Sequence, residues 1–333
     1  MRVIKFLLWI VVVALALVAI LFLVIKFTGP KRTGAMIYGI SFNSEYASYL
    51  GLNPRQVYEK ILGEWGFTHI RLSAQWNLIE KTKGQYDWKE LDWMMSEAAK
   101  KNAKVILTVG HKTPRWPECH FPDWVDISNH QAHKEDFFDF FKVVVGRYKN
   151  HPALEIWQIE NEPFLGFGEC AHLSKELLVE EVAQAKLWDP NHPTMVTDSG
   201  ELSLWRHTAK QADFFGTTLY RVVWSKMLGY WSYDWILPSF VYRAKLWFNG
   251  RDPNTAFVAE LQAEPWIPDA NLVETPLAEQ FKSMSLERLK KNIAFADKTG
   301  MARAYLWGAE WWYWLESHGA PEFSEYIKQL KKE

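Results

Sequence analysis

The stretch LEIWQIENEP, residues 154–163, is the part of the sequence that decides the fold. It begins with six largely apolar residues, which is typical of a strand buried on both faces of a parallel sheet. The polar triplet Glu160–Glu162 follows directly, and Pro163 ends the strand because proline has no amide donor. The stretch therefore predicts a parallel strand whose carboxyl end carries functional groups.

Similar apolar runs alternate with helical patterns on both sides of this strand. The eight expected strands are 36–42, 69–75, 104–109, 154–159, 195–197, 214–219, 256–259 and 303–307. The expected helices include 54–65, 134–148, 174–187, 277–296 and 322–331. Eight such alternations in about 300 residues predict an α/β fold of the (β/α)8 TIM-barrel type. An open doubly wound sheet is the alternative, but no glycine-rich phosphate turn follows the first strand.

An unbroken apolar run, Phe6–Ile25, precedes the barrel pattern. Its length matches the roughly 20 residues that cross a bilayer as a helix, so it predicts a single transmembrane helix in contact with lipid. A cleaved signal peptide is the alternative, but Lys26–Pro30 offers no cleavage site of small residues. We therefore expect an anchor and short linker over residues 1–34 and a single catalytic barrel over 35–333.

The overall composition excludes some classes of protein. The net charge of −1 argues against a nucleic-acid partner, which usually requires a strong basic excess. The chain contains 19 Trp, more than a core alone explains, so some are expected to line a groove. No set of His, Cys and carboxylate residues has metal-ligand spacing, and neither a cofactor nor an obligate protein partner is indicated.

Two glutamates follow strands that lie on opposite sides of a barrel mouth. Glu162 comes after the fourth strand and Glu260 after the seventh. Glycoside hydrolysis requires two facing carboxyl groups, one to protonate the leaving oxygen and one to attack or to activate water. Glu160 and Glu264 are the competing acids. Glu160 has the same strand parity as Glu162 but lies before the strand exit, and Glu264 lies four residues past Glu260 in a loop.

The motif Asn161-Glu162-Pro163, combined with Glu260, resembles the clan of retaining β-glycosidases with (β/α)8 barrels. This clan includes family 5 cellulases and mannanases and family 42 β-galactosidases. Further similar positions are Ile70–Leu72, Trp76, Ile79, Glu80, Gly84, Tyr86–Trp88 and Leu306–Gly308. The resemblance covers most of residues 36–315 and does not specify the sugar.

The resemblance implies hydrolysis of a β-linked oligo- or polysaccharide with retention. Glu162 would be the acid/base and Glu260 the nucleophile. Five further residues would form the substrate site: Arg71 holding Glu260 ionised, Asn161 binding the sugar 2-hydroxyl, Tyr220 donating to the nucleophile, His111 lining the sugar site and Trp307 forming a sugar platform. In a retaining enzyme the two carboxyl groups lie about 5–5.5 Å apart.

Other interpretations of these residues remain open. Arg71 would also suit a structural salt bridge, and His111 and Tyr220 would suit loop contacts. A glycan-remodelling transglycosylase would use the same residues, whereas a non-catalytic sugar-binding barrel would need neither glutamate. The aromatic segment 220–248 is interpreted as a packed insertion, with a lid, a substrate groove or a membrane-resting surface as alternatives.

The two cysteines and the substrate class bear on location. Cys119 and Cys170 follow neighbouring strands at similar distances, so we predict a disulfide, which requires an oxidising compartment. Basic residues flank both ends of the apolar run, so charge does not determine the orientation of a transmembrane helix. Because polysaccharides lie outside cells, we expect a single-pass protein of the cell membrane with an extracytoplasmic barrel.

Overall fold

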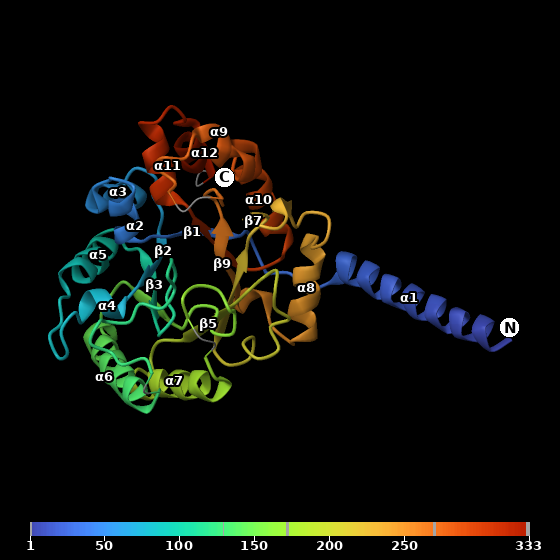
Figure 1. Ribbon diagram of the computed structural model, residues 1–333, viewed down its shortest axis with the longest axis horizontal. Coiled ribbons are helices and arrows are strands. Elements are labelled where there is room, and N and C mark those ends of the chain that lie inside the picture. Colours follow the sequence, from blue (N-terminus) through green and yellow to red (C-terminus); the bar gives the residue numbers. More distant parts are fainter. Residues whose placement is uncertain (1, 129, 171–172, 269–270, 331–333) are drawn as a thin grey trace.

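A computed structural model describes residues 2–128, 130–170, 173–268 and 271–330 of the chain. Its main body is a closed barrel of eight parallel strands inside a ring of helices (Figure 1). The barrel strands, in the order of the chain, are β1 (Ile37–Ser41), β2 (His69–Ser73), β3 (Lys104–Val109), β4 (Leu154–Ile159), β5 (Thr194–Asp198), β6 (Phe214–Leu219), β9 (Ala256–Gln262) and β10 (Arg303–Trp307). Closure of β10 onto β1 confirms the predicted (β/α)8 barrel and excludes the open sheet.

The crossover connections and loops contain the helices. These are α1 (Arg2–Thr28), α2 (Ser44–Tyr49), α3 (Pro54–Leu62), α4 (Trp76–Ile79), α5 (Lys89–Lys100), α6 (His130–Tyr148), α7 (Lys175–Trp188), α8 (Ser239–Phe248), the 3₁₀ turn η1 (Pro253–Thr255), α9 (Leu277–Ser283), α10 (Leu286–Lys298), α11 (Ala309–Glu316) and α12 (Glu322–Leu330). Two strands outside the barrel, β7 (Val222–Ser225) and β8 (Gly229–Ser232), form an antiparallel hairpin between β6 and α8.

Most strand boundaries agree with the prediction, but one predicted helix is wrong. The expected helix over 277–296 is divided into α9 and α10. Ser285 causes the division, because it lies in extended conformation and its side chain caps α10 by accepting from the Arg288 amide at 3.2 Å. The end of the last predicted helix, Lys331, lies outside the described residues.

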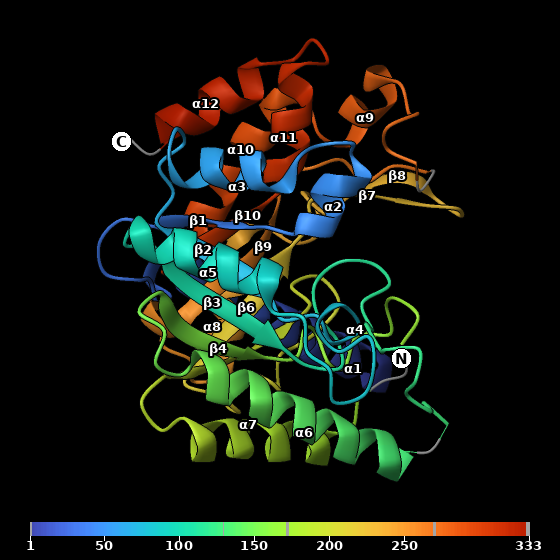
Figure 2. The same ribbon diagram turned by 90° about the vertical axis from the view of Figure 1, so that its left-hand side faces the viewer.

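Apolar side chains fill the barrel on both sides of the strands. Inside, a compact cluster is buried at the amino-terminal part of the barrel: Ile106, Ile156, Met195, Phe257, Ala259 and Tyr305. Outside, the alternate strand positions pack against the surrounding helices and form the larger core. Figure 2 shows the barrel from the side, with α6 and α7 along one flank and α10, α11 and α12 along the other. This packing leaves the carboxyl ends of the strands to carry polar groups.

Helix α1 projects from the side of the barrel (Figure 1). The linker that follows it is attached to the base of the barrel, where Arg32 pairs with Asp297 at 2.5 Å and the Thr33 amide donates to Asn254. Within the predicted transmembrane run, the side chains at 14, 15, 17–19, 21 and 22 lie outside the described residues. Among those that are described, no helix is both long and apolar enough to cross a membrane. The transmembrane helix therefore stays a prediction.

Candidate active site

The exit of β4 has an unusual backbone that separates its two glutamates. Glu160 and Glu162 have φ values of 62° and 45°, a left-handed region that residues other than glycine rarely adopt. Such backbone strain is concentrated at functional sites. The carboxylate of Glu160 turns aside and accepts the backbone amides of His111 and Lys112, each at 2.7 Å. The carboxylate of Glu162 instead accepts from Thr218 Oγ1 of β6 at 3.0 Å, which brings it into the barrel mouth.

An irregularity in β9 directs Glu260 toward the same mouth. Strand β9 continues to Gln262, past the predicted end at Ala259. Its pairing with β6 shifts register between Thr217 and Thr218, so that one extra residue precedes Glu260. A bulge of this kind re-aims the side chain that follows it. Glu260 therefore follows the interior residue Ala259 and still faces the cavity.

Arg71 connects both strand exits. Its guanidinium is 2% exposed and donates from Nη1 to Glu260 Oε1 at 2.8 Å and from Nη2 to Asn161 Oδ1 at 2.8 Å. Its Nε donates to Gln158 Oε1 at 2.7 Å. The other carboxylate oxygen of Glu260 accepts from the Tyr220 hydroxyl at 3.0 Å. Glu260 is thus held by a buried cation and a phenol, one at each carboxylate oxygen.

Glu162 has the opposite electrostatic environment. Burial raises the pKa of Glu162 well above its ordinary value, and the negative charge of Glu260, joined by that of Glu118 once Glu118 ionises, raises it further. The hydroxyl of Thr218 and the ammonium of Lys112 only partly oppose this effect. The two facing carboxyl groups therefore lie in different environments. Burial and negative neighbours favour the protonated form of Glu162, whereas Glu260 contacts the cation of Arg71 and the hydroxyl of Tyr220.

A third carboxyl group, that of Glu118, enters the site from the loop after β3. Its Oε2 accepts from Asn161 Nδ2 at 3.1 Å, and its side chain packs so closely on Gly168 that a Cβ there would lie 2.7 Å away. Burial first, and then the charge of Glu260, raises the pKa of Glu118 to about 8. Glu118 is therefore neutral through much of the physiological pH range, and it fixes the amide of Asn161.

Trp307 lies at the mouth, but its ring is already in contact with protein. The guanidinium of Arg115 lies 4.2 Å from its ring centre, and the indole donates to Glu264 Oε1 at 2.8 Å. Arg115 also pairs with Glu264 through its two terminal guanidinium nitrogens. Its guanidinium carbon lies 3.6 Å from the centre of the Tyr46 ring. Glu264 therefore binds this arginine and indole and is not one of the facing pair.

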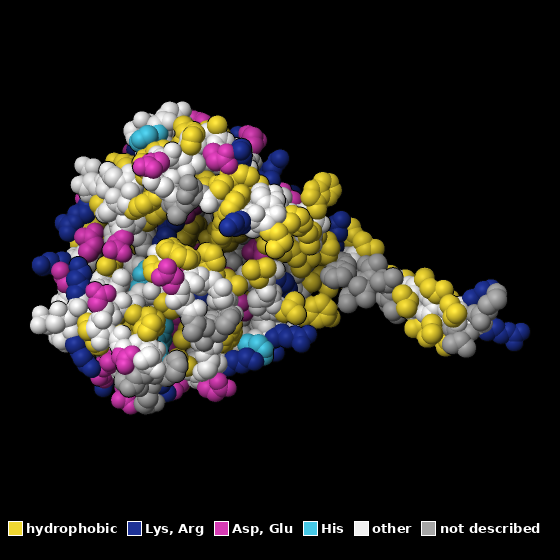
Figure 3. Space-filling view, in the orientation of Figure 1, with side chains coloured by type: hydrophobic (Ala, Val, Ile, Leu, Met, Phe, Trp, Pro, Cys, Tyr) yellow, Lys and Arg dark blue, Asp and Glu magenta, His cyan; other side chains and the backbone are white. Residues whose placement is uncertain are grey.

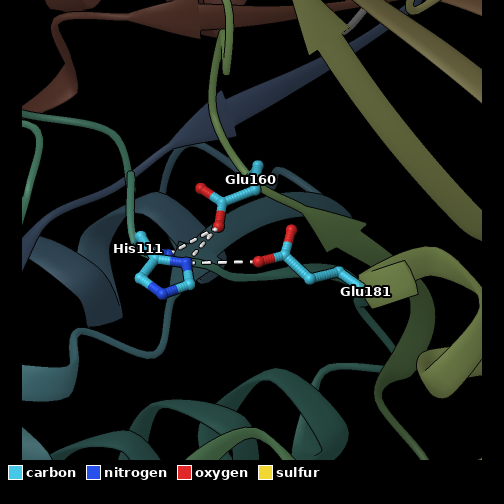
Figure 4. Close-up of side chains that lie close together, drawn as sticks. All are labelled: His111, Glu160 and Glu181. Atoms are coloured by element: carbon cyan, nitrogen blue, oxygen red, sulfur yellow. Dashed lines mark hydrogen bonds and ion pairs between the residues drawn. The ribbon is translucent and has the colours of Figure 1, made fainter. Parts of the chain in front are cut away.

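His111 contacts two other acids, Glu160 and Glu181, and its expected role in lining the sugar site stays a prediction. The side chain is almost fully buried, and Nδ1 lies 3.0 Å from Glu160 Oε1 and 3.2 Å from Glu181 Oε1 (Figure 4). Its ring lies 3.8 Å from that of Phe137. The Glu160 carboxylate holds both the backbone amide and the ring of His111, which fixes the position of the imidazole.

The same three side chains are the candidate metal ligands among the described residues, with ligand atoms within 4.8 Å of one another. Two of these three side chains hold protons at neutral pH. Burial would lower the pKa of His111, but its hydrogen bonds to Glu160 and Glu181 prevail and raise it to about 9. Burial and the charge of Glu160 raise the pKa of Glu181 to about 8. At neutral pH His111 is therefore charged and Glu181 is neutral, so the cation of His111 lies between two buried acids.

The predicted disulfide between Cys119 and Cys170 is present. It links the loops that follow β3 and β4, with a sequence separation of 51 residues. Because Glu118 precedes Cys119 directly, the bridge fixes the loop that carries the third carboxyl group. Figure 3 shows a hollow near the centre of this face of the molecule, where the loops surround the barrel mouth.

The site contains functional residues that the sequence did not identify. Glu118 and Thr218 contact the two predicted site residues Asn161 and Glu162, and Gln158 contacts Arg71. Gln158 lies at an inward-facing position of β4, two residues after the interior residue Ile156, so strand alternation could have identified it. Glu118 had none, because a loop position acquires its neighbours only when the barrel closes.

Comparison with known proteins agrees with this geometry. The family model described as glycoside hydrolase family 42 β-galactosidase matches residues 58–176. A β-galactosidase from an Arthrobacter species is 26% identical over 171 residues, which cover 46% of this chain and 24% of that protein. A mannan endo-1,4-β-mannosidase from Oryza sativa is 24% identical over 192 residues, which cover 48% of this chain and 44% of that protein. The chain thus spans less than half the length of these relatives.

Solved structures show the same fold. The crystal structure of GH5_18 from Streptomyces cattleya, in complex with GlcNAc, superposes with a TM-score of 0.58 at 10% identity. It covers 84% of this chain and 71% of that one. Together with the sequence relatives, this likeness confirms the predicted resemblance: the chain is similar to the (β/α)8-barrel β-glycosidases of the clan that contains families 5 and 42.

Proposed function

We propose that the chain hydrolyses β-glycosidic bonds with retention of configuration, with Glu260 as nucleophile and Glu162 as acid/base. The observation that carries this proposal is the unequal environment of the two glutamates. Arg71 and Tyr220 contact Glu260, whereas burial and neighbouring negative charge raise the pKa of Glu162. The mechanism requires this division, one carboxylate to attack and one carboxylic acid to donate.

The reaction proceeds in two displacements. Glu260 forms a bond to the anomeric carbon while Glu162 transfers its proton to the glycosidic oxygen, which leaves with the bonding electrons. Glu162, now a carboxylate, removes a proton from water, and the water oxygen displaces Glu260. Both carboxyl groups return to their starting states. Asn161, held by Arg71 and Glu118, has an amide that can orient the sugar ring beside the nucleophile.

The test is hydrolysis by the full chain in detergent, beside Glu162→Gln and Glu260→Gln. The substrates are aryl β-glycosides and β-linked glucan, mannan, xylan and galactan. We expect activity on one sugar class, a β-configured first product by NMR, and loss in both variants. Glu160→Gln is unsuitable as a control because that carboxylate supports the backbone, whereas Glu287→Gln, on the surface of α10, is suitable.

Other outcomes separate the alternative functions. Transfer of the sugar to an added glycan in preference to water would identify a transglycosylase with the same glutamates. Binding of a glycan without turnover, unchanged in the two glutamine variants, would identify a non-catalytic sugar-binding barrel. An α-configured first product would contradict retention.

The location is a second part of the proposal. We infer that Phe6–Ile25 anchors the chain in a bilayer and that the barrel lies on the extracytoplasmic side. The apolar sequence of α1 supports the anchor, and the disulfide supports an oxidising compartment. Protease added to intact cells is expected to digest the barrel. A barrel that is digested only after lysis would contradict the orientation.

A further inference from the structure

Helix α8 and the turn that precedes it expose several large apolar side chains. Trp235 is 94% exposed, Phe248 61%, Ile236 56% and Trp247 53%. We call these four residues the α8 patch. Apolar side chains gather on this side of the molecule in the space-filling view, along α8 and near the base of α1 (Figure 3). Grouped exposed aromatic residues of this kind mark an interaction surface, because water does not favour them.

Helix α1 leaves the barrel at the same place. Arg243 of α8 donates to the carbonyl oxygen of Lys26 at 2.7 Å, and Ile25 is only 4% exposed. Phe27, at the end of α1, is 72% exposed. The apolar run Phe6–Ile25 therefore ends beside α8, the helix that carries part of the α8 patch (Figure 1).

Charges near the α8 patch suit an anionic surface. Lys26 is exposed at the end of α1, and the exposed Lys210 lies beside Gly250, two residues after Phe248. Asp234, the acidic neighbour of Trp235, is neutralised by Arg288 at 2.6 Å. Tryptophan at the edge of an apolar region with nearby lysines is the arrangement that favours the headgroup layer of a membrane.

We propose that the α8 patch rests in the headgroup layer of the bilayer that holds α1. This inference depends on the anchor in the proposed function and adds a second, peripheral contact. Because α1 projects from the side of the barrel and from neither end (Figures 1 and 2), the contact lays the barrel on its side. The mouth then opens along the membrane surface, where a soluble glycan can enter.

The experiment uses the full chain in vesicles of phosphatidylcholine with 30% phosphatidylglycerol. A fluorescent NBD group is attached to Ile236→Cys, and in a second preparation to Leu187→Cys on α7, which is 71% exposed. Both native cysteines are bonded to each other, so only the new cysteine reacts. We expect the emission at 236 to shift to the blue and to be quenched by spin-labelled lipid, and the emission at 187 to do neither.

Three results would overturn the inference, and they are distinguishable. If the chain floats with the vesicles and the labels at positions 236 and 187 show the same emission and the same quenching, the anchor is supported and the peripheral contact is contradicted. A blue shift at 236 without quenching by lipid would assign the patch to a second copy of the chain. A chain that does not float with vesicles would contradict the anchor itself.

A triple variant tests whether the lipid quenching depends on the aromatic side chains of the α8 patch. Trp235→Ser, Trp247→Ser and Phe248→Ser together, in the labelled Ile236→Cys chain, are expected to reduce the lipid quenching at least by half. All three side chains are exposed, so the fold is retained and hydrolysis of a soluble aryl glycoside stays unchanged. Leu187→Ser is the matched control, and quenching as strong as in the parent chain would contradict the proposal.

Discussion

Arg71 Nη1 lies 2.8 Å from Glu260 Oε1, and both side chains are almost fully buried. The ion pair joins the second strand of the barrel to the seventh, 189 residues later in the chain. A buried pair of this kind gives little net stability, but removal of one partner leaves an uncompensated charge. Its value here is chemical, since it holds the carboxylate of Glu260 at the barrel mouth.

Removal of the arginine tests that assignment. Arg71→Met removes one donor each from Glu260, Asn161 and Gln158, so we expect kcat/KM to fall by at least about 100-fold. Arg71→Lys keeps the charge but not the fork of donors, so its loss should be smaller. Steady-state kinetics of both variants provide the measurement, and a kcat/KM of Arg71→Met close to that of the parent chain would contradict the role of the pair.

The acid role of Glu162 predicts a dependence on the leaving group. In Glu162→Gln, hydrolysis of a dinitrophenyl glycoside should retain its first step, because that leaving group departs without a proton. Hydrolysis of an alkyl glycoside should fall by roughly 10²–10⁴-fold, the usual contribution of a general acid. Burst kinetics with the two substrates provide the measurement. Equal losses on both would mean that Glu162 does not protonate the leaving group.

The alkaline limb of the pH profile should depend on Glu118. Glu162 must be protonated to act, and it loses activity as pH rises through its raised pKa. Glu118 ionises at a pKa of about 8, and on the alkaline side of that value its negative charge contributes to the rise. Glu118→Gln removes the charge and keeps an acceptor for Asn161, so the alkaline limb of kcat/KM should shift to lower pH. Glu287→Gln should leave the limb in place, and a shift to higher pH in Glu118→Gln would contradict the argument.

The position of His111 predicts a stability effect. His111→Leu removes the cation between Glu160 and Glu181, both of which are fully buried. Breaking a buried pair in this way costs about 3–5 kcal/mol of unfolding free energy. We expect a large fall in Tm with kcat/KM largely retained below the transition. His207→Leu, at an exposed position, is the control. Normal stability of His111→Leu with weakened substrate binding would favour the interpretation that His111 lines the sugar site.

The disulfide predicts a further measurable loss. Reduction followed by alkylation should add two alkyl groups to the unfolded chain, and none without reductant. Cys119→Ser with Cys170→Ser should lower stability by roughly 2–4 kcal/mol, because the open 51-residue segment gains conformational freedom when unfolded. KM should rise more than kcat falls, since the loop bearing Glu118 is then less constrained. Equal melting of the variant and the parent would show that the bridge is dispensable.

Local pattern determined much of this protein. Apolar runs followed by polar residues predicted the strands from Ile37 to Trp307, and barrel closure then required their carboxyl ends to meet. That rule selected Glu162 and Glu260, and the resemblance to the β-glycosidase clan added Arg71 and Tyr220. The structure connects Glu260 with Arg71 and Tyr220, and Glu162 with the neighbouring strand β6. Even the disulfide followed from the positions of two loops on neighbouring strands.

Only the tertiary structure decided how these groups point. Strand alternation places Glu160 on the same face as Glu162. The left-handed backbone instead directs the Glu160 carboxylate to the backbone amide of His111. The bulge in β9 aimed Glu260 inward, and loop closure brought Glu118 to Asn161. Periodicity in a sequence specifies which face of a strand is apolar. Dihedral angles at strand ends and contacts between distant loops depend on the packing of the whole barrel, so no local stretch encodes them.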